Sequence, residues 1–371
     1  MNRRLALLDG LRLVAALMVV LYHYTAWNHG NWGDEGARET WPGLSQLTVF
    51  GNLGVPLFFV ISGFVILLSS YGKRPAKFIG SRIGRLFPAY WVAVIATGAL
   101  LFFMWPGAGD DFTYGDWAMN LTMIQSAFDV KSIDGVYWTL WVEMRFYAWI
   151  LALMLLGWLT PGRILAFAAL WPAAGIFAEA LGLSFLEDAM LKQHAPLFAG
   201  GMVLFLIYRF GHTPLRWIIL GTNVALSAYF TGIRLSGEVD WLVGYEIAPE
   251  AYWPMVVAVF ALLAVVTLTP AVNLNVPGLA VAGALTYPVY LLHQMWGWWG
   301  IGILSDYLPQ SATLAVVMLV VLGAAYAVHR WVERPLGRPL AGAVTRGVDL
   351  SGAWLSGAAA ALRPALLRRT G

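Results

Sequence analysis

The sequence contains no cysteine and little charge. Because none of its 371 residues is a cysteine, disulfides, thiolate metal sites and a cysteine nucleophile are excluded. Charged residues make up 12% of the chain, whereas soluble domains typically carry about 25%. The formal net charge of +3 is small and scattered, so we do not expect nucleic acid as a partner.

Familiar motifs for metals and phosphate cofactors are also missing. No spacing of His, Asp and Glu resembles a metal site, and the chain has neither a glycine-rich phosphate loop nor a Gly-x-Ser-x-Gly nucleophile elbow. We therefore expect no metal and no permanently bound cofactor.

What the sequence does contain is long apolar runs. Hydrophobic residues make up 60% of the chain, and several runs approach or exceed the roughly 20 residues that a spanning helix needs. These runs predict an all-α, polytopic integral membrane protein with about ten transmembrane helices, near residues 5–26, 47–70, 83–105, 137–159, 163–181, 195–209, 214–233, 250–270, 279–299 and 311–331.

The distribution of charge predicts the orientation of these helices. With the N-terminus in the cytoplasm, most of the 23 lysines and arginines fall on the cytoplasmic side, as the positive-inside rule requires. Both termini are then cytoplasmic, and the outer loops at 106–136 and 234–249 are the largest soluble features. We expect a transmembrane domain over 1–340 and a basic cytoplasmic tail over 341–371, which is either amphipathic or disordered.

The first helix contains two polar residues that the bilayer disfavours. Arg12 and His23 are eleven positions apart, which returns to within roughly 20° of one helical face and separates them by about 16 Å along the axis. A histidine can act as a base near neutral pH. Alternatively, Arg12 is an ion-pair partner of Asp9 and His23 is an interfacial residue.

Two further ionisable residues are predicted at a similar depth. Glu143 lies about 9 Å inside the outer end of its helix, where a carboxyl group must be neutralised, pair with a cation such as Arg12 or His23, or face water. His293 lies about 21 Å along its helix, in the same outer half. A lone buried histidine is more often a core residue, but three such groups at one depth favour a common site.

Arginines and small residues complete the pattern. Arg82 and Arg85 are neighbours at i and i+3 near the cytoplasmic side, where guanidinium groups suit phosphate from a cofactor or a lipid. For the preceding Lys73, Arg74 and Lys77, a plain positive-inside anchor is the alternative. The segment GNLGVPLFFVISGFVI (51–66) contains small residues, among them Ser62, that permit close approach of a backbone or a ligand.

Taken in order, these stretches resemble the membrane acyltransferase-3 family, integral-membrane enzymes that O-acylate bacterial surface glycans and some antibiotics. The resemblance covers about residues 5–340, with Arg12 and His23 as its most specific element. Thr286 stands where the family commonly has Ser, and Pro56 where it often has an acid. The stretches are LDGLRLVAALMVVLYHY, GVPLFFVISGF, SRIGRLFPAYW, YWTLWVEMRFY, APLFAGGM, TYPVYLLHQ and VERP.

The resemblance implies a cytoplasmic acyl-CoA donor, usually acetyl-CoA, and a hydroxyl acceptor on a sugar, glycan or lipid-linked sugar. The protein would be an O-acyltransferase (O-acetyltransferase) of the bacterial inner membrane that modifies polysaccharide of the cell envelope. His23 would act as general base or carry the acyl group itself. The expected site comprises catalytic His23 and Glu143, donor-binding Arg12, Arg82 and Arg85, and substrate-binding Ser62, Trp138, Tyr147, Tyr287 and His293.

A proton-coupled secondary transporter is the main alternative function, because buried Arg, Glu and His residues also equip such carriers. Release of free CoA from acetyl-CoA in the presence of an acceptor would distinguish the enzyme. A non-enzymatic scaffold in a glycan-export complex is the third possibility.

Overall fold

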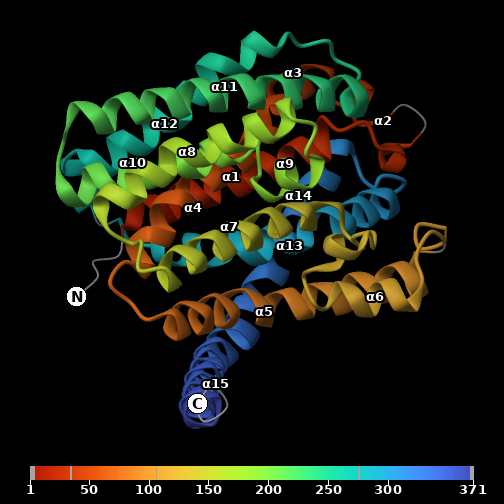
Figure 1. Cartoon of the computed structure of the whole chain (residues 1–371). Helices are drawn as coiled ribbons and strands as arrows, with labels where there is room; N and C mark the ends of the chain where they lie inside the picture. Colours follow the sequence, from red (N-terminus) through yellow and green to blue (C-terminus); the bar gives the residue numbers. More distant parts are fainter. Residues whose placement is uncertain (1–4, 34–35, 106, 275, 368–371) are drawn as a thin grey trace.

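The protein is a bundle of helices (Figure 1). The computed structural model describes residues 5–33, 36–105, 107–274 and 276–367, with side chains as far as Ser351, and the described chain contains no β-strand. A helix stands at each of the ten expected ranges: α1 (Ala6–Thr25), α4 (Gly54–Ser70), α5 (Pro75–Ala99), α7 (Trp138–Leu155), α8 (Pro161–Ala180), α10 (Ala195–Phe210), α11 (Pro214–Val243), α12 (Trp253–Leu268), α13 (Leu279–Leu304) and α14 (Gln310–Val328).

Shorter helices connect these ten, and one long helix follows them. The short helices are α2 (Gly36–Thr40), α3 (Pro42–Thr48), α6 (Tyr114–Asn120) and α9 (Ser184–Ala189). A π-helical turn (His329–Glu333) joins α14 to α15 (Arg334–Leu367). We call the end of the bundle where α1 begins the basic end, because Arg82, Arg85, Arg334 and Arg338 lie there, and the opposite end the loop end.

Seven helical stretches in the described residues are long and apolar enough to cross a membrane: 6–25, 42–70, 75–104, 161–180, 214–243, 249–268 and 310–351. The helix α10 is apolar but shorter. Helices α7 and α13 are not among the seven, and they carry Glu143 and His293, which lower their hydropathy. The composition of these helices is that of a multi-pass membrane protein.

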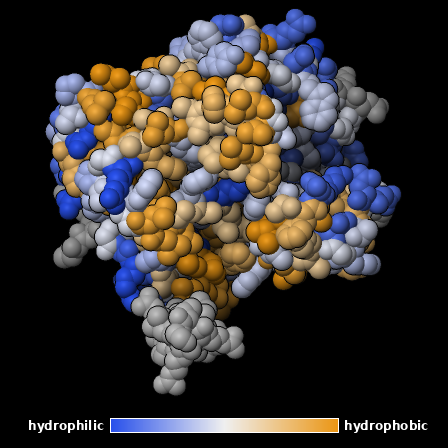
Figure 2. Space-filling view, viewed as in Figure 1, coloured by the Kyte–Doolittle hydropathy of each residue, from blue (hydrophilic) through white to orange (hydrophobic). Residues whose placement is uncertain are grey.

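Large apolar side chains cover much of the outer surface. Figure 2 shows apolar residues across the middle of one face, with hydrophilic residues gathered towards its margins. Among the exposed side chains are Leu170, Phe177, Leu319 and Val320, each more than 60% exposed. A surface of this kind is favourable against lipid and unfavourable against water.

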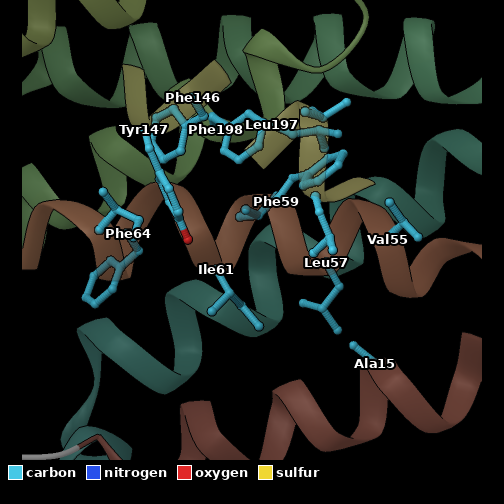
Figure 3. Packing of buried hydrophobic residues seen from close by; sticks show 14 of the residues in the cluster. Ala15, Val55, Leu57, Phe59, Ile61, Phe64, Phe146, Tyr147, Leu197 and Phe198 are labelled. Carbon is cyan, nitrogen blue, oxygen red and sulfur yellow. The ribbon is translucent and has the colours of Figure 1, made fainter. Parts of the chain in front are cut away.

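Helix α4 is the buried centre of the bundle, packed between α1 on one side and α7 and α10 on the other (Figure 3). Small residues allow this packing. A Cβ at Gly63 would collide with the carbonyl of Phe198, and one at Gly54 with the carbonyl of Ala15. The expected role of these small residues in close helix approach is therefore confirmed.

Two helices are longer than the sequence predicted. Helix α5 begins at Pro75 rather than near 83, with the proline in its first turn, where proline is favourable. Helix α11 continues to Val243 rather than ending near 233, so most of the expected 234–249 loop is helical. The added turns are held by the apolar face of Leu235, Val239 and Val243, all of which are buried.

Helix α15 crosses α5 and then leaves the bundle towards the C-terminus (Figure 1). Its first turns fit closely because Gly80 and Gly84 of α5 face Gly337, Ala341 and Thr345 of α15. The expected boundary at residue 340 lies inside this helix. Arg3 and Arg4, which contributed to the predicted orientation, lie outside the described residues.

Candidate active site

His23 lies in the last turn of α1 and is only 7% exposed. Its Nδ1 is 2.7 Å from the carbonyl oxygen of Val19. Because a carbonyl oxygen can only accept, Nδ1 must carry the proton and donate it. In this neutral tautomer Nε2 retains its lone pair, as a general base requires.

His293 lies beside His23 and is fully buried in α13. Its Nδ1 donates to the carbonyl oxygen of Tyr290 at 2.8 Å, so its Nε2 is an acceptor. That Nε2 is 3.4 Å from Nδ1 of His23, and the two rings meet edge to face with centroids 4.9 Å apart. The Nδ1–H of His23 therefore points at both Val19 and His293, which orients the ring.

Hydrogen bonds between α1 and α13 fix this histidine pair. The hydroxyl of Tyr24 donates to the carbonyl oxygen of His293 at 2.7 Å, and the indole N–H of Trp298 donates to the carbonyl oxygen of His23 at 2.9 Å. Trp27 stacks on the imidazole of His23 with centroids 5.1 Å apart. Each histidine is thus held through both its ring and its backbone.

A cavity of about 510 Å³ opens beside His23 at the loop end. We call it the outer cavity. Its wall includes His23 on α1, Trp138 on α7 and a row of residues on α11. The volume falls within the range of ordinary small-molecule sites, which run from roughly 300 to 1,000 Å³.

Glu143 does not lie in the outer cavity but in a narrow central cavity of about 90 Å³. It accepts a hydrogen bond of 2.9 Å from the hydroxyl of Ser62. No hydrogen bond in the described residues joins Glu143 to His23, and the electrostatic neighbours of Arg12 include Glu143. The residues Arg12, Ser62, Arg82, Arg85, Glu143, Tyr147, Thr286 and Tyr287 all line this central cavity.

At the basic end a third cavity of about 770 Å³ gathers positive charge. We call it the basic-end cavity. Its guanidinium groups belong to Arg12, Arg82, Arg85, Arg334 and Arg338, and within the described chain none of them forms an ion pair. Of the acids at this cavity, Glu333 pairs with His329 at 2.8 Å, and Asp9 is a neighbour of Arg12. Such a group of arginines suits a ligand with several phosphates.

The three cavities adjoin one another along the bundle. Arg12, Arg82 and Arg85 line both the basic-end and the central cavity. Val55 and Tyr290 line both the central and the outer cavity. The three cavities therefore follow one another, with shared walls, from the arginines past Arg12 and Glu143 to His23.

The structure groups the predicted site residues in three places. His23, His293 and Trp138 lie at the loop end; Ser62, Glu143, Tyr147 and Tyr287 lie at the centre. Arg12, Arg82 and Arg85 lie where the central cavity meets the basic-end cavity. The hydroxyl of Tyr287 donates to the carbonyl oxygen of Leu86 at 3.2 Å, which ties α13 to α5.

Sequence reasoning missed several lining residues. Arg334, which belongs to VERP, and Arg338 were counted only among the cytoplasmic charges, although their i, i+4 spacing was a readable sign that they share a helical face. On α11, Arg234, Glu238 and Trp241 looked like loop residues because the helix was expected to stop before them.

A buried carboxyl group lies just before α7 and contacts the backbone of α13. Asp134 has no exposed surface, and burial raises its pKa to about 7. Its carboxyl oxygens accept hydrogen bonds from the backbone N–H of Val136 at 3.1 Å and of Met295 at 3.4 Å. Asp134 thereby docks the segment before α7 onto α13.

Known proteins resemble this chain along most of its length. A family model described as "Acyltransferase domain" matches residues 5–330. "Nodulation protein 10" of Rhizobium leguminosarum bv. viciae is 29% identical over 336 residues, which cover 77% of this chain and 81% of that protein. "Exopolysaccharide production protein ExoZ" of Rhizobium meliloti is 28% identical over 320 residues, or 78% and 90% of the two chains.

A third relative matches a shorter region. "Putative membrane-bound transacylase BcsY" of Komagataeibacter xylinus is 30% identical over 190 residues, which cover 47% of this chain and 44% of that protein. No solved structure matches significantly.

Proposed function

This chain belongs to the acyltransferase-domain family, and on that premise we propose that it is an O-acyltransferase of the cytoplasmic membrane. In this proposal an acyl group, acetyl in the first instance, moves from acyl-CoA at the basic end to a sugar hydroxyl at the loop end. The line of three adjoining cavities from the arginines to His23 carries the proposal.

The basic-end cavity supports acyl-CoA as the donor. CoA bears phosphates on its nucleotide, and five guanidinium groups without ion-pair partners in the described residues are placed to bind them. The central cavity of about 90 Å³ is too narrow for a nucleotide but suits an extended chain. The nucleotide stays among the arginines, and the pantetheine arm extends past Arg12 towards His23. The positive-inside rule then places the basic end in the cytoplasm.

The chemistry proposed at the loop end is direct transfer. Nε2 of His23 takes the proton of the acceptor hydroxyl while the hydroxyl oxygen attacks the thioester carbonyl. The tetrahedral intermediate collapses with cleavage of the C–S bond, and the imidazolium returns the proton to the leaving thiolate. The products are an ester on the acceptor and free CoA.

Glu143 has a different role in this scheme from the one expected at first. It lies with Ser62 and Arg12 in the central cavity, so we propose that it balances the charge of Arg12 and positions the donor arm. His293, which lies against His23, orients the base.

The name of the relative from R. meliloti concerns exopolysaccharide production, which supports a glycan as the acceptor of this chain. The outer cavity is large enough for such a ligand.

The test is release of free CoA by the purified protein in lipid nanodiscs with acetyl-CoA and a glycan acceptor. We expect His23→Ala to lower kcat by at least a hundredfold, because general acid–base catalysis contributes about 10²–10⁴-fold. His212→Ala is the matched control, because His212 is exposed and lies at the other end of the bundle.

Three outcomes would contradict the proposal in different ways. If the His23→Ala variant were as active as the wild type, His23 would not be the general base. A burst of CoA release without acceptor would indicate an acyl-histidine relay instead of direct transfer. Uptake of a solute by proteoliposomes without CoA release would indicate a transporter.

A further inference from the structure

One wall of the outer cavity has no part in the chemistry proposed above. It is formed by Arg234, Glu238 and Trp241 on α11, together with Asn52 and Gln294 from other segments. We propose that this wall, here called the α11 wall, is a binding subsite for an uncharged sugar ring and selects neutral over acidic sugar acceptors. This inference rests on the proposed function.

The charges on the α11 wall cancel. Nη1 of Arg234 is 2.9 Å from Oε2 of Glu238, one helical turn away, and both side chains are largely buried. The guanidinium also lies over the ring of Trp138, 5.4 Å from its centroid. A cation already held by a carboxylate and an aromatic face offers little to an anionic ligand. The arginines of the basic-end cavity, by contrast, form no ion pair within the described residues.

The remaining ionisable residues of the outer cavity add no cation. His194 lies just before α10, and burial, with Arg234 and Arg145 nearby, lowers its pKa well below the usual range. His23 is the neutral base of the proposed chemistry, with its Nδ1–H donated to the Val19 carbonyl. The outer cavity is therefore uncharged overall, which disfavours a uronic acid or a sugar phosphate.

Two amide side chains that line this cavity carry a buried oxygen without a hydrogen-bond partner in the described residues. Asn52 is 4% exposed and Gln294 is 2% exposed. The Nδ2 of Asn52 approaches the hydroxyl of Tyr252 at 3.4 Å, but Oδ1 of Asn52 and Oε1 of Gln294 bond to nothing within the described residues. Buried polar atoms are normally satisfied. Sugar hydroxyl groups are donors of the kind these oxygens lack.

Aromatic faces complete the subsite. Trp241 is 84% exposed at the edge of the outer cavity, and Trp27 lines the same cavity while stacking on His23. An indole face packs well against the C–H face of a pyranose ring, whose hydroxyl groups then point outward to the amides. Because Trp27 touches the imidazole of His23, a ring held here presents a hydroxyl to the base.

The experiment measures acyl transfer from acetyl-CoA to two matched acceptors, methyl glucoside and methyl glucuronide, with the full chain in nanodiscs. We expect the wild type to favour methyl glucoside by at least tenfold in kcat/KM. Trp241→Ala should raise the KM for methyl glucoside about tenfold, with the change falling on KM rather than kcat. Trp217→Ala is the control, because Trp217 is an exposed tryptophan at the opposite end of α11.

A second variant tests the charge balance independently of packing. Glu238→Gln keeps the shape of the side chain but leaves Arg234 without its carboxylate. We expect the preference for methyl glucoside over methyl glucuronide to fall by at least tenfold. A matching gain in thermal stability on adding methyl glucuronide to this variant would report the same change without turnover.

The outcomes separate this inference from the proposed function. A wild type that prefers methyl glucuronide, or variants at Trp241 and Glu238 that leave KM and preference unchanged, would overturn the subsite while leaving acyl transfer intact. Transfer to whole glycan but to neither methyl glycoside would also overturn it. Absence of CoA release with every acceptor would overturn the acyltransferase proposal itself.

Discussion

At the scale of single residues, the orientation of one imidazole ring determines what the site can do. The Nδ1–H of His23 faces Val19 and His293, so the basic nitrogen faces the outer cavity. If the imidazole ring of His23 rotated freely, Nδ1–H instead of the basic Nε2 would face the outer cavity part of the time. The second histidine therefore contributes orientation.

His293 is a positioning residue in this scheme, and a pair of substitutions tests it. His293→Phe removes the acceptor for the Nδ1–H of His23, and we expect kcat to fall about tenfold, equal to roughly 1.4 kcal/mol. His293→Gln keeps an acceptor oxygen and should restore most of kcat. The KM for acetyl-CoA should stay constant in both, as measured by CoA release.

A purely structural role for His293 would give a different pattern. Both variants would then lose thermal stability and activity together, and His293→Gln would be no more active than His293→Phe.

At this scale the sequence singles out candidate residues but does not show which of them are partners. Arg12, His23, Glu143 and His293 stood out because ionisable groups are costly in apolar helices. Which of them meet depends on how four separate helices pack, and helical periodicity describes only one helix at a time. The structure sets His23 against His293 and Glu143 against Ser62.

At the scale of elements, the segment before α7 is attached to α13 through a buried carboxyl group. Asp134 accepts backbone hydrogen bonds from both sides of this junction, and its pKa is raised to about 7 by burial. The segment therefore responds to pH close to neutrality.

The sign of this pH dependence follows from the raised pKa. The protonated carboxyl group is favoured in the folded state, so its contribution is fully present below the unfolded pKa of about 3.9 and is lost as the pH rises through about 7. Over this window the loss amounts to ~4 kcal/mol at most. As the pH rises from 5 to 8, we expect the melting temperature of the wild type to fall relative to that of Asp134→Asn, because the amide cannot ionise.

Thermal unfolding of both proteins in the same detergent at each pH measures this difference. Asp116→Asn is the control, because Asp116 is exposed and its pKa is lowered by hydrogen bonds from Thr113. Parallel curves for Asp134→Asn and the wild type would contradict the assignment.

The apolar runs predicted where long helices lie better than where those helices end. Apolar runs located a helix at every expected range, but polar helical turns beyond a run are not visible as hydropathy. The last turns of α11 contain Ser, Gly, Glu and Asp among apolar residues, and only the buried Leu235, Val239 and Val243 show that the helix continues. The α11 wall lies in those turns.

At the scale of the whole molecule, the C-terminal helix α15 forms part of the wall of the basic-end cavity. Helix α15 lies against α5 through small residues and places Arg334 and Arg338 opposite Arg82 and Arg85. Residues about 250 positions apart in the chain thus contribute to one group of charges.

This arrangement predicts that the C-terminal helix contributes to donor affinity. Replacing Arg334 and Arg338 together by Ala should raise the KM for acetyl-CoA about 10- to 100-fold, because a hydrogen bond to a charged group contributes roughly 1.5–3 kcal/mol. With acetyl-pantetheine, which lacks the nucleotide phosphates, the same variant should match the wild type. CoA or pantetheine release measures both.

Arg346→Ala is the control on the same helix, because Arg346 is exposed and does not line the basic-end cavity. An equal loss with both donors would show that α15 supports the fold and does not bind phosphate.

The narrow centre of the cavity line has a consequence for the cell as well as for the reaction. A membrane protein with cavities on both sides of the bilayer must not let ions leak through it. Between its two wide cavities this bundle leaves only about 90 Å³, bordered by Arg12, Glu143 and the ring of Tyr147. A bound donor arm would fill this central cavity during turnover. Between turnovers, the positive charge of Arg12 would repel protons and sodium ions from the same cavity. Under the proposed function, the chain would pass a small acyl group outward while the membrane kept its voltage.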